Sequence, residues 1–260
     1  MGNERPGIGI QLYTLRNELQ QDFEGTLRAL AEIGYEGLEF AGYGGRAAGD
    51  VKRLLDELGL RAIGSHVGFP ALRGRLAEEI AAVKELGGDY LICPSVPMDQ
   101  RHAGAPWPSL FGELEQFGAL AREAGLSFGY HNHAFEFEIA IDGRPVFDAL
   151  FGATSPENVI AEMDACWVQT GGRDPVEYIR RYAGRAPLLH FKDYGAIEGG
   201  GKDTVELGEG ELDLPAILQA ALEARTEWLI VEQDRCQRDP LQSAANSFAW
   251  LKRALDGAVP

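Results

Sequence analysis

The sequence predicts an α/β fold with one domain, residues 1–260, in which eight parallel strands close into a (β/α)₈ TIM barrel. Eight short apolar runs alternate with eight longer amphipathic stretches along the whole chain, and parallel strands need such crossover helices. The length of 260 residues fits a fold that typically takes about 250. An open sheet would normally carry a Gly-rich phosphate loop after its first strand, but Gly7-Ile8-Gly9 lies at or inside that strand.

The first half of the chain contains four strand–helix units. The predicted strands cover residues 7–13, 35–40, 60–65 and 90–93, and the predicted helices cover residues 23–33, 51–58, 77–86 and 109–124. In the first helix, Phe23, Leu27, Leu30 and Ile33 recur at helical spacing. A glycine directly follows each of the four helices, which is the residue preferred just beyond a helix C-terminus.

The second half repeats the same alternation. Its predicted strands cover residues 126–131, 159–164, 187–191 and 228–232, and its predicted helices cover residues 146–151, 175–182, 214–224 and 243–255. No linker separates the two halves. A closed barrel of eight units therefore accounts for the chain better than two smaller domains do.

Charge and composition narrow the class of protein. Forty Asp and Glu against 24 Lys and Arg give a net charge of −16, which argues against binding to nucleic acid or to an anionic membrane. Three widely spaced cysteines form no CxxC pair, and neither an apolar leader nor a run of about 18 apolar residues is present. We therefore expect a cytoplasmic protein with no membrane partner and no disulfide framework.

Histidines and carboxylates gather at the predicted strand ends. The active site of a TIM barrel lies at the carboxyl ends of its strands, and His66, His131, His133 and His190 all fall there. Any one such residue is more often a solvated loop residue or a helix cap than a ligand. Several imidazoles and carboxylates pointing into one mouth, however, would be costly to bury without a cation. The pattern predicts a divalent metal site, since imidazole with carboxylate suits Mn, Fe, Co or Zn.

Several motifs carry a resemblance to a known family. They are Gln11–Arg16, Gly34–Glu39, His131–Phe137, Glu162–Asp164, His190–Tyr194, Gly208–Asp213 and Val231–Asp234. In order and spacing, over essentially the whole chain, the sequence resembles the xylose-isomerase-like TIM barrels. These include sugar-phosphate isomerases and epimerases, tagatose 3-epimerase-like enzymes, inosose dehydratases and endonuclease-IV-like proteins.

The resemblance implies a ligand set for the metal, which is expected to be Mn, Mg, Co, Fe or Zn. The family usually uses Glu, Asp, His and Glu from strands five to eight, and Asp164, His190 and Glu232 match three of these positions. The strand-five position holds His131 where the family usually has Glu, so the site loses one negative charge. Glu136, five residues further on, is the alternative ligand, ranked second because a loop residue is less well fixed.

The resemblance also implies roles around the metal. Glu232 is expected to carry a proton, with Glu136 or His133 as its partner, and Lys192 to contact a substrate oxygen or assist proton transfer, or simply to pair with Asp193. The expected substrate-binding residues are His66, Glu39, Trp167 and Asp193; Glu39 is alternatively an anchor for Arg16, and His66 and Trp167 are alternatively packing residues. Trp167 stands where endonuclease-IV-like members carry a metal-binding His, which argues against DNA cleavage.

The predicted function follows from this chemistry. A divalent metal chelates neighbouring substrate oxygens and stabilises an enediolate while a base and an acid move the proton. If the proton returns to the enediolate, the enzyme is an isomerase or epimerase of a sugar, keto-sugar or related polyol. The alternatives are an inosose-dehydratase-like lyase on the same metal site and a non-catalytic sugar-binding barrel. Substrate phosphorylation stays open, as does formation of a homo-oligomer.

Overall fold

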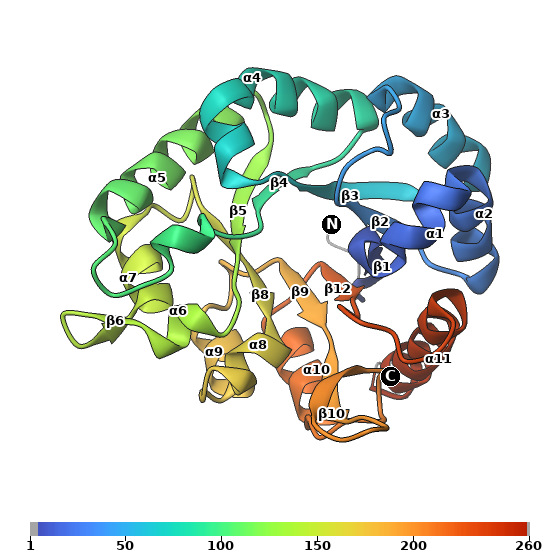
Figure 1. Ribbon diagram of the computed structural model, residues 1–260. Helices are drawn as coiled ribbons and strands as arrows, with labels where there is room; N and C mark the ends of the chain where they lie inside the picture. Colours follow the sequence, from blue (N-terminus) through green and yellow to red (C-terminus); the bar gives the residue numbers. More distant parts are fainter. Residues whose placement is uncertain (1–4, 259–260) are drawn as a thin grey trace.

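A computed structural model describes residues 5–258 and shows a closed barrel of eight parallel strands surrounded by helices (Figure 1). The strands neighbour one another in the order β1-β12-β9-β8-β5-β4-β3-β2, with β1 and β2 paired to close the ring. Their bounds are β1 Gly7–Gln11, β2 Gly37–Phe40, β3 Arg61–His66, β4 Tyr90–Cys93, β5 Ser127–His131, β8 Ile160–Asp164, β9 Leu188–Phe191 and β12 Trp228–Val231. The predicted TIM barrel is confirmed.

Helices after the strands form the outer layer. The main ones are α2 Phe23–Ile33, α3 Ala48–Leu58, α4 Phe69–Leu86, α5 Trp107–Glu123, α7 Val146–Ala153, α9 Pro175–Arg181, α10 Leu214–Glu223 and α11 Pro240–Ala258. Outward-facing strand residues such as Leu38, Phe128 and Leu229 are buried in one core with the helices. Each predicted helix is present, and several extend beyond the bounds that their apolar periodicity predicted.

Two differences from the predicted elements have local causes. β1 ends at Gln11 rather than at residue 13, because the Gln11 side chain accepts a hydrogen bond from the Tyr13 backbone N–H and starts the 3₁₀ turn η1 Leu12–Leu15. α4 begins at Phe69, well before residue 77, since Pro70 suits a first helical turn, and a kink at Arg75 interrupts it.

Short elements in the loops were not predicted. They are α1 Arg16–Gln21, η2 Met98–Gln100, α6 Phe135–Glu138, α8 Ala165–Thr170, and the hairpins β6 Ala140–Ile141 with β7 Arg144–Pro145 and β10 Asp193–Ala196 with β11 Lys202–Val205. All follow the carboxyl ends of barrel strands or connect to a helix there. They build up the walls around the barrel mouth.

The amino-terminal half of the barrel interior is an apolar layer. Inward-facing residues from different strands pack there as a separate buried cluster: Ile63, Tyr90, Ile92, Leu188, Trp228 and Ile230. Glycines on β1 and β2 make room for the indole of Trp228, because a Cβ on Gly7 or Gly37 would lie 2.5 or 2.7 Å from its ring. This apolar layer closes the barrel below the predicted site.

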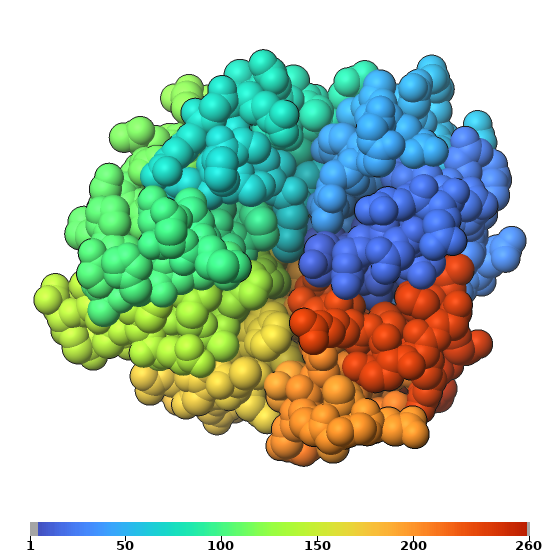
Figure 2. Space-filling model, in the orientation of Figure 1, coloured from blue at the N-terminus to red at the C-terminus, as the bar shows by residue number. Residues whose placement is uncertain are grey.

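The first and last parts of the chain meet to complete the structure. β1 pairs with β12, with Gly7 opposite Trp228, and the Tyr35 hydroxyl donates to the Ala244 carbonyl of α11. The space-filling view shows the blue segment near the start of the chain beside the red segment near its end (Figure 2).

Candidate metal centre and active site

The site lies at the carboxyl ends of the strands, and strand geometry explains which residues enter it. Side chains alternate sides along a strand, so Asp164 points to the same side as Glu162 and Ile160, the last of which packs on the inner apolar layer. His190 lies two residues beyond Leu188 on β9 in the same way. One strand thus contributes apolar filling below and a polar group above.

Four side chains from four neighbouring strands converge at the mouth. His131, Asp164, His190 and Glu232 each offer one ligand atom, and these four atoms all lie within 4.8 Å of one another. We call them the metal cluster. All four residues are at most 6% exposed. His190 Nδ1 lies 2.7 Å from Glu232 Oε2, and His131 Nε2 lies 3.8 Å from Asp164 Oδ2.

The donor set of this cluster fits a divalent transition metal. Two imidazoles and two carboxylates are the ligand types that Zn, Fe, Co or Mn accept. Asp164, Glu232 and nearby Asp234 bring three carboxylates around the single ammonium of Lys192, so these four charged groups leave an excess of two negative charges. A divalent cation would balance that excess.

Lys192 is a buried ammonium beside the cluster. Its Nζ lies 3.0 Å from Asp164 Oδ2, 2.7 Å from Glu232 Oε2 and 2.9 Å from Asp234 Oδ2. The predicted alternative, a salt bridge to Asp193, is not formed. Burial opposes the charge, but the three carboxylates raise the pKa of Lys192 well above its usual value. The residue therefore carries a fixed positive charge next to two predicted ligands.

Two further buried carboxylates, Glu39 and Glu162, contact the imidazoles from behind. We call them the second carboxylate pair. Glu162 Oε2 lies 3.1 Å from His131 Nδ1, and Glu39 Oε2 lies 2.8 Å from His190 Nε2. His66 Nε2 bridges the pair, at 2.6 Å from Glu162 Oε2 and 3.2 Å from Glu39 Oε2. The alternative role of Glu39 as an anchor for Arg16 is not observed, since Arg16 donates to the Tyr13 carbonyl.

The charge states of the histidines differ because their neighbours differ. Burial alone would lower the pKa of the His66 imidazole, but Glu39 and Glu162 outweigh it and raise that pKa to about 10. His133 has no such partner, so burial, with Lys192 and Arg101 nearby, lowers its pKa to about 3. His66 is therefore protonated at neutral pH, whereas His133 is neutral.

His133 and Trp167 form an aromatic wall beside the cluster. Their rings are nearly parallel, with centroids 6.1 Å apart, and Lys192 Nζ lies 5.3 Å from the Trp167 ring centroid. Both side chains are partly exposed. His133 Nδ1 and Trp167 Nε1 are nevertheless buried atoms with no hydrogen-bond partner among the described residues. The wall thus offers an apolar face and two free polar atoms.

Glu136 and Asp193 hold loops in place. Glu136 accepts hydrogen bonds from the Tyr130 hydroxyl and the His133 backbone N–H, and it does not belong to the metal cluster. Burial raises its pKa to about 7. The two oxygens of Asp193 accept hydrogen bonds from four backbone N–H groups, those of Tyr194, Gly208, Gly210 and Leu212. The carboxylate oxygens of Glu136 and Asp193 are thus occupied by hydrogen bonds within the protein, which disfavours the expected roles of Glu136 as ligand or proton carrier and of Asp193 as substrate contact.

Three polar residues of the site lie in the motifs noted in the sequence but were given no role there: Gln11, Glu162 and Asp234. Gln11 Nε2 donates to Glu39 Oε2 at 2.8 Å. Glu162 had a signal in the sequence, because it lies two residues before Asp164 in a strand and must share its side of the sheet. Asp234 lies two residues after Glu232 but beyond the end of β12, where that rule no longer holds.

The barrel is that of a known family. Residues 27–254 match the xylose isomerase-like TIM barrel family, and the chain belongs to it. Inosose dehydratase of Geobacillus kaustophilus (strain HTA426) is 25% identical over 98% of this chain and 89% of its own. A sugar phosphate isomerase/epimerase from Parabacteroides distasonis ATCC 8503 superposes with a TM-score of 0.82, at 26% identity over 95% of this chain and 97% of that one.

A more distant solved structure holds a metal. The IOLI protein with a bound zinc atom superposes with a TM-score of 0.74, at 14% identity over 97% of this chain and 98% of that one, and so shares the fold.

Among residues 5–258, no helix is long and apolar enough to cross a membrane.

Proposed function

We propose that this chain is a divalent-metal-dependent enzyme that moves a proton on the carbon next to the carbonyl of a sugar, keto-sugar or related polyol. The metal cluster of His131, Asp164, His190 and Glu232 carries the proposal, because four buried ligand atoms converge within 4.8 Å. A bound divalent ion would supply a Lewis acid that polarises the carbonyl and acidifies the neighbouring C–H bond. Return of the proton makes the enzyme an isomerase or epimerase.

The chain's own residues supply positioning and proton transfer. Lys192 favours the ionised forms of Asp164 and Glu232, although burial still raises the pKa of Asp164 to about 6, and the Lys192 ammonium is the proposed donor to a substrate oxygen. Glu232 and neutral His133 are the proposed proton carriers. The buried His133 Nδ1 has no hydrogen-bond partner among the described residues, and a bound substrate would supply one. Trp167 provides a flat apolar face for a sugar ring.

A second candidate is a lyase that eliminates water from a cyclic polyol ketone. It is favoured by the match over nearly the full chain to a protein named inosose dehydratase. The same first step serves both reactions, because the carbanion-like state either takes back a proton or expels a β-hydroxyl group. The two reactions therefore differ only in what happens to the carbanion-like state.

Metal content tests the site directly. Protein purified without chelator is expected to contain close to one equivalent of Zn, Mn, Co, Fe or Mg, and Asp164→Ala is expected to lose it. Asp256→Ala, an exposed carboxylate on α11, is the matched control and should retain it. Metal-free wild-type protein after soaking and desalting would contradict the proposal.

Isotope exchange then separates the two reactions. In D₂O, a ketose that gains deuterium without losing water supports the isomerase or epimerase. An inosose that yields a dehydrated enone supports the lyase. If metal-loaded protein gives neither result with any of the ketoses and inososes, a sugar-binding barrel is favoured.

A further inference from the structure

The second carboxylate pair touches the two imidazoles of the metal cluster from the opposite side. Each imidazole has two ring nitrogens, and only the one without a proton can bind a metal. In His190, Nε2 faces Glu39 and Nδ1 faces Glu232. In His131, Nδ1 faces Glu162 and Nε2 faces Asp164. The two histidines therefore present different nitrogens to the same cluster.

We propose that Glu39 and Glu162 are positioning residues that fix this choice. Glu162 accepts a hydrogen bond from Nδ1–H of His131, which leaves Nε2 free to bind metal. Glu39 accepts one from Nε2–H of His190, which leaves Nδ1 free. This inference rests on the proposed metal site, since it assigns the nitrogen by which each histidine would bind.

The imidazole at strand five gives Glu162 a further role. As a ligand, His131 would bring no negative charge to the metal cluster. The carboxyl group of Glu162 is fully buried and lies 3.1 Å from His131 Nδ1, on the side of the ring away from Asp164. A carboxylate behind a ligating imidazole also makes that imidazole a stronger donor.

Of the two carboxylates, Glu162 has more contacts with the imidazoles, so its replacement should disturb the site more. Its Oε2 lies near three imidazole nitrogens, at 2.6 Å from His66, 3.1 Å from His131 and 3.3 Å from His190. Its Oε1 is buried with no hydrogen-bond partner among the described residues. A single oxygen thus forms hydrogen bonds with the rings of His66 and His131 and lies near the ring of His190. The amide oxygen of a glutamine in its place would be a weaker acceptor for both hydrogen bonds.

Zinc binding to variants tests the inference. Chelator competition should show that Glu162→Gln raises the zinc dissociation constant about 10- to 100-fold, and Glu39→Gln by a similar or smaller factor. Glu206→Gln is the matched control, because Glu206 is a buried carboxylate that contacts Ser243, Asn246 and Arg238 outside the site. Its dissociation constant should stay within about twofold of wild type.

A spectroscopic measurement needs no variant. In ¹⁵N-labelled, zinc-loaded wild-type protein, imidazole correlation spectra should show the proton on Nδ1 of His131 and on Nε2 of His190. The opposite tautomer at either ring overturns the inference, even if the Glu162 variant fails to fold.

The outcomes distinguish the inference from the proposed function. Wild-type protein that binds no metal contradicts both. Stoichiometric zinc with unchanged affinity in Glu162→Gln contradicts the inference alone. A second equivalent of zinc that disappears in Glu162→Gln also overturns it, because His66, His131, Glu162 and His190 would then be ligands of a second ion.

Discussion

The two ends of the barrel interior use the same strands for opposite purposes. At the amino-terminal end, inward-facing positions hold Leu188, Trp228 and Ile230. Two to four residues further along the same chain segments stand His190, Lys192 and Glu232, all buried and all charged or able to be charged. The lower half is a packed apolar layer, whereas the upper half concentrates ionisable groups that are costly to bury.

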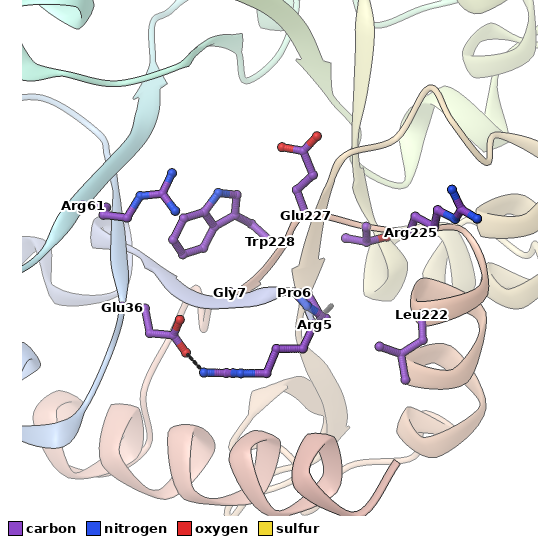
Figure 3. Close-up of a pocket in the computed structure, with 10 residues that line it drawn as sticks. Arg5, Pro6, Gly7, Glu36, Arg61, Leu222, Arg225, Glu227 and Trp228 are labelled. Carbon is purple, nitrogen blue, oxygen red and sulfur yellow. Dashed lines mark hydrogen bonds and ion pairs between the residues drawn. The ribbon is translucent and has the colours of Figure 1, made fainter. Parts of the chain in front are cut away.

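The difference shows where stability and chemistry reside. Filling the lower layer removes apolar surface from water and favours folding. The upper layer gains little net stability from its ion pairs, because desolvation offsets their attraction. A pocket outside the lower end is lined by residues that include Arg61, Glu227 and Trp228, and it contains none of the predicted site residues (Figure 3).

The largest effect is expected from emptying the lower layer. Trp228→Ala removes the indole that fills the space above Gly7 and Gly37, and should lower the free energy of unfolding by about 3–5 kcal/mol. Denaturant titration measures this. Trp228→Phe should lose much less, and a loss below about 1 kcal/mol for the alanine variant would contradict a packed lower layer.

Lys192→Met should show that the upper layer depends on charge balance. In metal-free protein it leaves Asp164, Glu232 and Asp234 without their ammonium, and the free energy of unfolding should fall by about 3 kcal/mol. That is the lower end of the range for a broken buried ion pair, because the Asp234 side chain is 29% exposed. Added zinc should restore part of the stability. If added zinc does not change the unfolding curve of the variant, that result would contradict a cation site beside Lys192.

The smallest effect is expected at the aromatic wall. Trp167→Ala should weaken substrate binding by about 1 kcal/mol, which corresponds to about a fivefold rise in KM, with little change in stability. Trp167→Phe should keep most of the binding. Steady-state kinetics on the substrate identified by isotope exchange makes the measurement, and an unchanged KM in the alanine variant would assign Trp167 to packing.

The fold was predictable from the sequence because its signals are local and repeated. Apolar runs and amphipathic helices such as Phe23–Ile33 recur eight times, and each carries its own periodicity. The loops were less predictable. Hairpins such as β10 with β11 depend on contacts of Asp193 with the distant backbone of Gly208 and Gly210, which no local pattern encodes.

The candidate site was predictable only as far as strand ends indicate it. His131, Asp164, His190 and Glu232 were expected together, and the structure brings them together. The two oxygens of Glu136 accept hydrogen bonds from the Tyr130 hydroxyl and from a backbone N–H of the loop after β5. Contacts of this kind depend on tertiary geometry, so the sequence alone left His131 and Glu136 as alternatives.

The position of Trp228 also has a consequence for biosynthesis. The indole that fills the space left by Gly7 and Gly37 belongs to the last strand of the barrel. Chains are made from the amino terminus at about 5–20 residues per second, so the first two strands emerge well before their filling residue. The barrel cannot close until residue 228 has left the ribosome, and the apolar strand surfaces exposed during that interval are prone to aggregation.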